Sequence, residues 1–260
     1  RGPEVAMPVA RCRLLGTFAE TWKTLEESHG DRDWLVVVDR RLVRARPGLY
    51  LGLRAARRRG VVELTGGETV KSLRRIDDLA AAAHRVGLGR DGLVVAVGGG
   101  TVGDLAGFFA AVWMRGVDWI PVATTTLSIA DSAVGGKTAV DWKGLKNQLG
   151  CFHDPLEVLA VEEALATLPT RHYRAGLAEV VKSAVVSDAG LFATLEREAD
   201  DLRSRRSERL VEVLEKASAI KARIVARDPR ERGIRAWLNF GHTVGHALES
   251  VHRPRLYHGE

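Results

Sequence analysis

Short apolar runs alternate with helical stretches along the amino-terminal part of the chain. Four runs are continuous and rich in β-branched residues, which is typical of strands buried in a parallel sheet: 35–38, 61–64, 93–97 and 119–123. The segments 72–86 and 105–112 carry apolar residues in a pattern typical of helices. Strands that alternate with helices predict a Rossmann-like, doubly wound α/β domain, in which helices cover both faces of a parallel sheet.

The pattern changes near residue 170. Residues 174–200 and 207–227 form long amphipathic stretches that are poor in glycine and proline, so we predict helices there. Another helix is predicted over 238–251, beginning near Gly241. We therefore expect an α/β domain over 1–170 and an all-α domain over 171–260. In such architectures, ligands bind at the carboxyl ends of strands or between domains.

Composition and charge exclude several classes of protein. The chain is 45% hydrophobic and 28% charged, as in ordinary globular proteins, and its longest apolar runs fall short of the roughly 20 residues of a membrane helix. Its net charge of +6 comes from arginines scattered beside acidic residues, without a nucleic-acid-binding motif. This favours a solvated arginine-rich surface or an anionic small substrate over nucleic acid. Cys12 and Cys151 are far apart and predict free thiols in a cytoplasmic protein.

A glycine loop follows the predicted strand 93–97. Gly98, Gly100 and Gly103 match G-x-G-x-x-G between a strand and a helix, where a pyrophosphate can approach the backbone at the helix amino-terminus. This context favours dinucleotide binding, although a glycine-rich turn also has purely conformational uses. Asp39, which ends an earlier strand, is a candidate for binding ribose hydroxyls, and a helix cap is the equal alternative.

Histidines and a glutamate in the helical part predict a metal site. His242 and His246 are four residues apart and share a helix face, a spacing that by itself is more often structural. Glu179 lies in a helix rich in small residues without an obvious partner nearby in sequence, and His258 lies in the motif His-Gly-Glu. One carboxylate and two imidazoles leave open positions on a metal such as zinc, as in catalytic sites. We therefore predict a divalent metal held by Glu179, His242 and His258.

Basic and amide side chains recur beside glycine turns and beside the predicted metal ligands. Each by itself would be a solvated surface residue, but their density predicts a site for phosphate and carboxylate groups. They are Lys137, Lys146, Asn147, Lys182, Lys221, Arg235 and Asn239.

Together these motifs resemble the 3-dehydroquinate synthases, a family of sugar-phosphate cyclases. The resemblance runs from about Asp39 to Glu260. The motifs that carry it are Gly-Gly-Gly-Thr-Val-Gly-Asp-Leu-Ala-Gly-Phe (98–108), Met-Arg-Gly (114–116), Asp-Ser-Ala-Val-Gly-Gly-Lys-Thr-Ala-Val (131–140), Leu-Lys-Asn (145–147), Ala-Gly-Leu-Ala-Glu-Val-Val-Lys (175–182) and Leu-Asn-Phe-Gly-His-Thr-Val-Gly-His-Ala-Leu-Glu (238–249).

The resemblance implies a role for each matching residue. It makes Glu179, His242 and His258 the ligands of zinc or cobalt, and it makes His246 a proton-handling neighbour. The implied NAD contacts are Asp39, Glu68, Lys71, Gly100, Thr101, Val102, Gly103, Asp104, Thr124, Thr125, Lys137, Lys146 and Thr167. The implied catalytic residues are Lys137, Lys146, Asn147, Lys182, Arg235 and His246, and the implied substrate contacts are Arg115, Asp131, Lys221 and Asn239. Glu231 matches a position near the phosphate side of the site.

The resemblance also implies an activity. Members of the family convert 3-deoxy-D-arabino-heptulosonate 7-phosphate to 3-dehydroquinate and phosphate in the shikimate pathway. They are carbon–oxygen lyases that use catalytic NAD and a divalent metal, and they are commonly homodimers. We therefore expect a small sugar phosphate as the partner, with no nucleic acid and no membrane.

Alternatives and departures remain. A cyclase of the amino-dehydroquinate type and a metal-dependent polyol or glycerol-phosphate dehydrogenase are the rival enzymes, and a regulatory module is the non-enzymatic alternative. Ala123, Ile129 and Asp141 depart from the family pattern, and we expect none of them to touch a residue with an assigned role. The family's helical domain continues for about 100 residues past His-Gly-Glu, so we expect a partial domain in which His258 is poorly held.

Overall fold

The computed structural model describes residues 10, 12–46, 48, 49, 59–65, 67–252 and 256–260. The chain divides into two compact units. The first, here called the α/β unit, comprises 13–125 and 136–167, and the second, here called the helical unit, comprises 1–12, 126–135 and 168–260. The last of these divisions lies between residues 167 and 168, but the segment 126–135 also belongs to the helical unit.

A six-stranded sheet forms the centre of the α/β unit. Its order is β1-β8-β5-β4-β2-β3. The pairs β2–β3, β2–β4, β4–β5 and β5–β8 are parallel. The strands are β1 (Cys12–Leu15), β2 (Trp34–Asp39), β3 (Arg59–Leu64), β4 (Leu93–Gly98), β5 (Asp118–Ala123) and β8 (Val158–Val161). Each of the four predicted strands is present.

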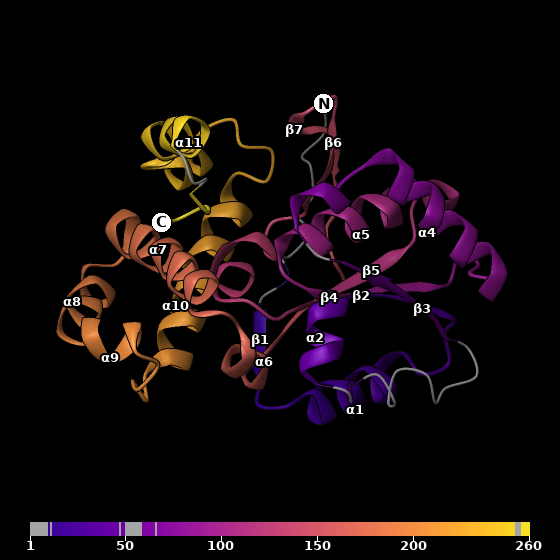
Figure 1. The fold of residues 1–260 in the computed structure, drawn as a ribbon, viewed down its shortest axis with the longest axis horizontal. Coiled ribbons are helices and arrows are strands. Elements are labelled where there is room, and N and C mark those ends of the chain that lie inside the picture. Colours follow the sequence, from indigo (N-terminus) through magenta and orange to yellow (C-terminus); the bar gives the residue numbers. More distant parts are fainter. Residues whose placement is uncertain (1–9, 11, 47, 50–58, 66, 253–255) are drawn as a thin grey trace. The chain divides into compact units, whose positions relative to one another are not determined.

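Helices cover both faces of this sheet (Figure 1). Alternate residues of a strand point to opposite faces. Accordingly, Val36 and Val38 of β2 pack in one apolar core with α1 (Phe18–His29) and α2 (Arg40–Ala45). Leu35 and Val37 pack in a second core with α4 (Leu73–Val86) and α5 (Gly100–Val112). Short helices in the described part of the unit include η1 (Glu68–Val70), η2 (Trp113–Arg115) and α6 (Glu162–Thr167). The Rossmann-like prediction is confirmed.

The α/β unit also contains an antiparallel hairpin that the hydrophobic pattern did not predict. It consists of β6 (Lys137–Trp142) and β7 (Leu145–Phe152). Lys143 and Gly144 both have positive φ, at 48° and 80°, as a tight two-residue hairpin turn requires. The pattern concealed the hairpin because most of β7 is exposed and carries polar residues.

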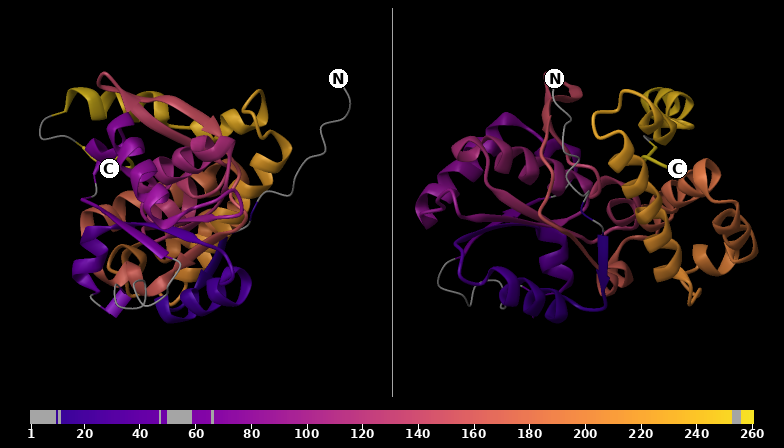
Figure 2. Two further views of the ribbon diagram at one scale, coloured as in Figure 1. Left: turned by 90° about the vertical axis from the view of Figure 1, so that its right-hand side faces the viewer. Right: turned by 180° about the vertical axis from the view of Figure 1, so that it is seen from behind.

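The helical unit is built mainly from α7 (Thr170–Ser187) and α10 (Leu210–Arg227). Both pack against the short π-helical turn η3 (Ser128–Ser132), and α10 also packs against η4 (Ile234–Asn239). The other helices of the unit are α8 (Ala189–Arg197), α9 (Ala199–Arg203) and α11 (His242–Val251), which Figure 2 shows from two further directions. No helix in the described part of the chain is both long enough and apolar enough to cross a membrane.

One predicted helix is interrupted. The stretch 174–200 was predicted to be continuous, but it is split among α7, α8 and α9. Asp188 adopts an extended backbone, and its carboxylate accepts a hydrogen bond from the backbone N–H of Leu191, so that it caps α8. An aspartate that caps a helix competes with helix continuation, and this local competition outweighed the apolar periodicity.

Close backbone packing positions η3 against α7. A Cβ atom added to Gly176 would lie 2.1 Å from Oγ1 of Thr126, so only glycine fits at this crossing. The same hydroxyl of Thr126 donates a hydrogen bond to the carbonyl oxygen of Tyr173 at 2.8 Å. This contact fixes the segment that carries Asp131 beside the helix that carries Glu179 and Lys182.

Candidate metal centre

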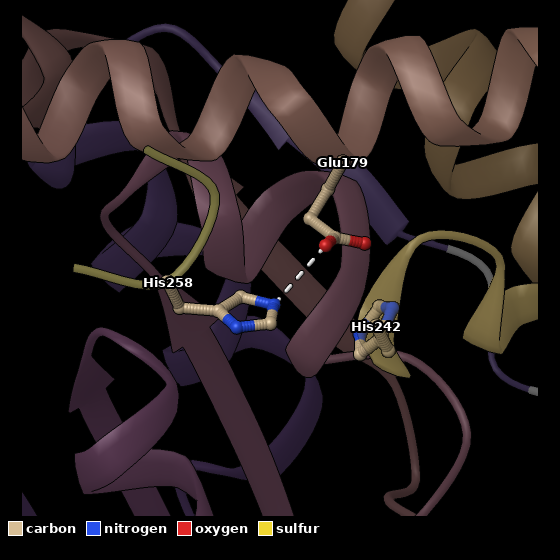
Figure 3. A group of neighbouring side chains, drawn as sticks. All are labelled: Glu179, His242 and His258. Atoms are coloured by element: carbon tan, nitrogen blue, oxygen red, sulfur yellow. Dashed lines mark hydrogen bonds and ion pairs between the residues drawn. The ribbon is translucent and has the colours of Figure 1, made fainter. Parts of the chain in front are cut away.

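Three side chains from distant parts of the helical unit converge (Figure 3). Glu179 projects from α7, His242 begins α11, and His258 lies in the segment 256–260. One ligand atom of each lies within 4.8 Å of the others, and Nε2 of His258 is 3.2 Å from Oε1 of Glu179. The structure thus brings together the three residues that the sequence singled out as metal ligands.

The donor atoms fit a divalent cation. Glu179 is only 4% exposed, and its buried Oε2 makes no hydrogen bond to any described residue, although Nζ of Lys182 forms an ion pair with it. A buried carboxylate that lies close to two imidazoles suits zinc or cobalt. Lys182 is also a partner three residues along α7, which corrects the expectation that Glu179 has none nearby in sequence.

The electrostatics of the three side chains differ. Burial lowers the pKa of His242, which favours the neutral imidazole that a metal needs. The hydrogen bond with Glu179 raises the pKa of His258 in spite of burial. Burial alone would raise the pKa of Glu179, but the hydrogen bond with His258 and the ion pair with Lys182 lower it overall. Glu179 is therefore an anion that a cation can bind.

Helix α11 brings further groups to this site. The rings of His242 and His246 are 5.1 Å apart, and those of His246 and His258 are 5.6 Å apart. Oε1 of Glu249 lies 2.9 Å from Nδ1 of His258. Sequence reasoning missed Glu249, although its position seven residues after His242 places it on the same face of the helix.

A buried ion cluster adjoins the metal centre. Asp131 on η3 lies between two lysines, with Oδ1 at 2.9 Å from Nζ of Lys221 and 3.2 Å from Nζ of Lys182. Burial would raise the pKa of Asp131, but the two lysines lower it far below its usual range. Burial lowers the pKa of Lys221. Burial alone would also lower the pKa of Lys182, but the charges of Asp131 and Glu179 raise it overall. Lys182 links this cluster to the metal centre.

Two further predicted residues make protein contacts in the helical unit. Arg235 is 2% exposed and donates to the carbonyl oxygens of Pro229 at 2.7 Å and Gly135 at 2.9 Å. Nδ2 of Asn239 donates to Oε1 of Glu231 at 2.8 Å. Arg235 therefore fixes the loop 133–135 that follows Asp131, in addition to any role toward an anion.

The glycine loop lies at the carboxyl end of β4, where parallel sheets bind ligands. Gly99 precedes α5, which begins at Gly100, five residues earlier than predicted. The backbone N–H of Thr124, just after β5, donates to the carbonyl oxygen of Gly98 at 3.1 Å. The predicted NAD-binding residues of the loop thus form the first turn of a helix, beside Thr124 and Thr125.

Lys71 connects this loop to the hairpin. The lysine is 4% exposed, its Nζ donates to Oδ2 of Asp104 at 2.7 Å, and it also contacts Oδ1 of Asn147. Glu68 lies 3.8 Å from both Lys71 and Lys146. The fold therefore gathers five predicted cofactor and catalytic residues in one cluster of the α/β unit.

Asp141 takes part in this arrangement. Its Oδ1 accepts a hydrogen bond from the backbone N–H of Asn147 at 2.8 Å, and Asn147 has a positive φ of 55°. The expectation that Asp141 touches no residue with an assigned role is wrong. The hairpin register brings the two residues together across the turn, which sequence distance did not reveal.

The other predicted residues lie at separate positions in the α/β unit. Oδ1 of Asp39 accepts from the backbone N–H of Arg41 at 2.9 Å and caps α2, which is the alternative use weighed for this carboxylate. Oγ1 of Thr167 donates to the carbonyl oxygen of Ala164 at 3.1 Å. Arg115 ends η2 with a φ of 71°, and Lys137 begins β6.

Comparison with protein families decides the lineage. The model of the 3-dehydroquinate synthase amino-terminal region matches residues 61–175, and the model of the carboxyl-terminal region matches 176–260. The chain belongs to the 3-dehydroquinate synthase family. A 3-dehydroquinate synthase of Xylella fastidiosa (strain M23) is 44% identical over 225 residues, which cover 84% of this chain and 59% of that protein. One of Nostoc punctiforme is 46% identical over 200 residues, which cover 76% and 55%. The chain thus spans less than two thirds of these relatives.

Solved structures of other cyclases share the fold. A 2-epi-5-epi-valiolone synthase from Streptomyces hygroscopicus subsp. jinggangensis with NAD+ and Zn2+ bound is 26% identical, with a TM-score of 0.86 over 100% of this chain and 73% of that one. A 2-deoxy-scyllo-inosose synthase complexed with carbaglucose-6-phosphate, NAD+ and Co2+ is 25% identical, with a TM-score of 0.80 over 96% and 72%. A sulfoacetaldehyde reductase from Bifidobacterium kashiwanohense, at 17% identity and a TM-score of 0.65 over 84% and 65%, shares the fold alone.

Proposed function

We propose that this chain carries the NAD- and metal-binding parts of a 3-dehydroquinate synthase. The reaction converts 3-deoxy-D-arabino-heptulosonate 7-phosphate to 3-dehydroquinate and phosphate, and it makes the enzyme a phosphate-eliminating lyase. The convergence of Glu179, His242 and His258 beside a buried lysine cluster is the observation that carries the proposal. The names of the relatives that are 44% and 46% identical support the choice of reaction.

The cofactors would occupy different units. The glycine loop at the first turn of α5 offers backbone N–H groups to the pyrophosphate of NAD. The donor atoms of Glu179, His242 and His258 would hold Zn2+ or Co2+. The solved valiolone and inosose synthases, which contain NAD+ with Zn2+ or Co2+, support both assignments.

A bound metal would supply Lewis-acid stabilisation of negative charge on substrate oxygens. Lys182 has a raised pKa and therefore presents a permanent positive charge beside Glu179. Asp131 holds Lys182 and Lys221 in place, and the two ammonium groups suit the carboxylate and phosphate of the substrate. His246 is exposed one turn after His242, so its imidazole can exchange a proton with a bound hydroxyl.

The lysine cluster favours a cyclase over a polyol dehydrogenase. A dehydrogenase of neutral polyols needs NAD and a metal, but it has no use for two buried ammonium groups beside the metal ligands. Lys182 and Lys221 are 7% and 8% exposed, and burial of such groups is costly unless they serve a structure or a ligand. A cyclase of the amino-dehydroquinate type shares this chemistry and is the remaining alternative.

We extend the proposal to assembly and location. Exposed apolar side chains on α11 and at Phe240, which lies between η4 and α11, support a homodimer, since Phe240, Val244 and Val251 are 62%, 66% and 73% exposed. The free thiols of Cys12 and Cys151 support a cytoplasmic enzyme.

Phosphate release tests the reaction. The assay uses the 260-residue chain and a version extended to the length of its relatives, each with NAD and Zn2+, and the heptulosonate phosphate as substrate. We expect the extended version to release phosphate, and we expect this release to require NAD and to stop when a chelator is added. Absence of phosphate release by the extended version would refute the synthase reaction. Accumulation of NADH with glycerol as substrate would indicate a dehydrogenase. Release of phosphate from an amino-substituted analogue alone would indicate the amino-type cyclase.

A further inference from the structure

Both ring nitrogens of His258 face carboxylates. Nε2 lies 3.2 Å from Oε1 of Glu179, and Nδ1 lies 2.9 Å from Oε1 of Glu249. The side chains of His258 and Glu249 are 33% and 14% exposed, so solvent only partly screens this contact. A metal-bound imidazole is neutral and carries one N–H. A carboxylate at Nδ1 would hold that proton there while Nε2, which faces Glu179, binds the cation.

Glu249 reaches His258 because of its place on α11. It follows His242 by seven residues and His246 by three, so all three lie on one helix face. The ring of His258 is 5.1 Å from that of His242. A single helix face thus presents a proposed ligand, a proton-handling neighbour and a carboxylate that orients a second ligand.

The backbone of His258 is fixed by a separate set of contacts, here called the 256–260 clamp. Arg171 forms a bidentate ion pair with Glu260, with distances of 2.5 and 2.6 Å, and its guanidinium lies 3.9 Å from the ring centroid of Tyr257. The Tyr257 ring also stacks on His172 at 4.6 Å. These contacts hold His258 on α7, the helix that carries Glu179, contrary to the expectation that it is poorly held.

Gly259 permits the clamp to lie close to α7. Its φ is +87°, and a Cβ atom added there would lie 2.2 Å from the carbonyl oxygen of Ala175. Any other residue would meet both backbone strain and a collision with an atom that cannot move without disturbing the helix. The contact therefore sets the distance of the His258 backbone from α7.

His246, Glu249 and His258 are close enough to suggest a second metal site. Such a site would need Nδ1 of His258 as a ligand, with no proton on it. At 2.9 Å from a carboxylate oxygen, Nδ1 is at hydrogen-bond distance, which favours a shared proton over a shared cation. The geometry is that of a carboxylate–histidine–metal arrangement with one metal, bound at Nε2.

We propose that Glu249 and the 256–260 clamp together position His258. Glu249 orients the imidazole ring of His258, and the clamp fixes the backbone of His258. The proposal rests on the proposed metal role of Glu179, His242 and His258. It assigns Glu249 a positioning role rather than a ligand role. Metal binding and the docking of the segment 256–260 on α7 are accordingly coupled.

Zinc affinity tests the part played by Glu249. The 260-residue chain and its Glu249→Gln variant compete with a chromogenic chelator for Zn2+, and Glu212→Gln on α10 serves as a charge-matched control. Loss of an orienting carboxylate typically weakens metal binding about 10- to 100-fold. We expect this loss of Zn2+ affinity for Glu249→Gln, and we expect the affinity of the Glu212→Gln control to stay within twofold of that of the parent chain. All three proteins should bind one metal per chain, and the circular dichroism of the metal-free proteins should be unchanged.

The outcomes separate three conclusions. Glu249→Gln binding within twofold of the parent chain would overturn the positioning role. Two metals per chain, of which Glu249→Gln loses one, would replace it with a second metal site. A parent chain that binds no Zn2+ would refute the proposed metal centre itself, and with it this inference. The visible absorption bands of bound Co2+ report the ligand geometry. We expect these bands to shift in Glu249→Gln at saturating metal, whereas a purely structural role for Glu249 would leave them unchanged.

A glycine pair tests the clamp. Gly144 also has positive φ, at +80°, but an added Cβ would meet nothing within 4 Å, so Gly144→Ala has the backbone strain without the collision. We expect Gly259→Ala to weaken Zn2+ binding at least tenfold and Gly144→Ala to leave it within twofold. Arg171→Met, which removes the guanidinium from Glu260 and Tyr257, should weaken binding in the same direction. Parent affinity in both Gly259→Ala and Arg171→Met would refute the role of the clamp.

Discussion

Replacement of Asp131 by asparagine would test the buried ion cluster most directly. The asparagine keeps the size of the side chain and removes the charge that lies 2.9 Å from Lys221 and 3.2 Å from Lys182. In the variant, Lys182 keeps its ion pair with Glu179. Among the contacts described, Lys221 keeps only the hydrogen bond that its Nζ donates to the backbone oxygen of residue 131, which is 2.8 Å long in the parent chain. The variant therefore leaves one lysine charge buried with little compensation.

The size of the effect follows from the burial of the three groups. Removing one partner of a buried ion pair costs about 3–5 kcal/mol. The side chains of Lys182 and Lys221 are 7% and 10% exposed, but that of Asp131 is 23% exposed, which allows partial screening by solvent. We therefore expect Asp131→Asn to lower the free energy of unfolding by about 3 kcal/mol at pH 7, the lower end of that range.

The effect should depend on pH with a definite sign. The two lysines hold the pKa of Asp131 below its unfolded value of about 3.9, so the stabilisation is present above that pH. It is lost as the pH falls through the folded value. Urea unfolding, followed by circular dichroism of the helices, should show a difference between parent and Asp131→Asn that is constant from pH 5 to 7, within about 0.5 kcal/mol, and shrinks below pH 4.

Two results would refute this reasoning. A loss of less than about 1 kcal/mol at pH 7 would mean that the cluster is solvated like a surface pair. A difference that grows below pH 4 would mean that the pKa of Asp131 is raised rather than lowered. The double variant Asp131→Asn, Lys221→Met serves as the control, because removal of the unpaired lysine should restore at least about 1 kcal/mol.

Three further changes address packing, cofactor and proton transfer. Gly176→Ala should lower the free energy of unfolding by about 1–3 kcal/mol, because the added methyl group collides with Thr126. If urea unfolding gave the variant the same stability as the parent chain, the close packing of the segment 126–135 against α7 would be contradicted. Lys71→Met should weaken NAD binding at least tenfold, because it removes the ammonium group that contacts Asp104 beside the glycine loop. An unchanged affinity in titration calorimetry would refute that role. His246→Gln should keep the Zn2+ affinity within threefold of that of the parent chain but lower the kcat of the extended enzyme about 100-fold. An unchanged kcat would exclude proton transfer by His246.

Local patterns in the sequence were enough to predict much of the α/β unit. The continuous apolar runs predicted four strands, because both faces of a parallel strand are buried and leave little alternation. The glycine loop was recognised from its position between a strand and a helix. Ordered motifs then identified the family, since a motif depends on residue identity and not on contacts.

The tertiary structure decided what depends on contacts between distant residues. Asp131 and Lys221 are 90 residues apart, and only the packing of η3 against α7 and α10 makes them partners. The hairpin 137–152 was concealed because its mostly exposed strand β7 carries polar residues, and Asp141 could not be linked to Asn147 without the register of the hairpin.

The metal centre shows both contributions. Residue types and spacing singled out Glu179, His242 and His258, because metals require particular donor atoms that few other roles require together. The sequence could not reveal that Glu249 faces the second nitrogen of His258, or that the 256–260 clamp holds this residue on α7. Donor chemistry is a property of single residues and can be read along a chain. Orientation is a property of the fold, because it depends on which side chains the packing places next to each donor.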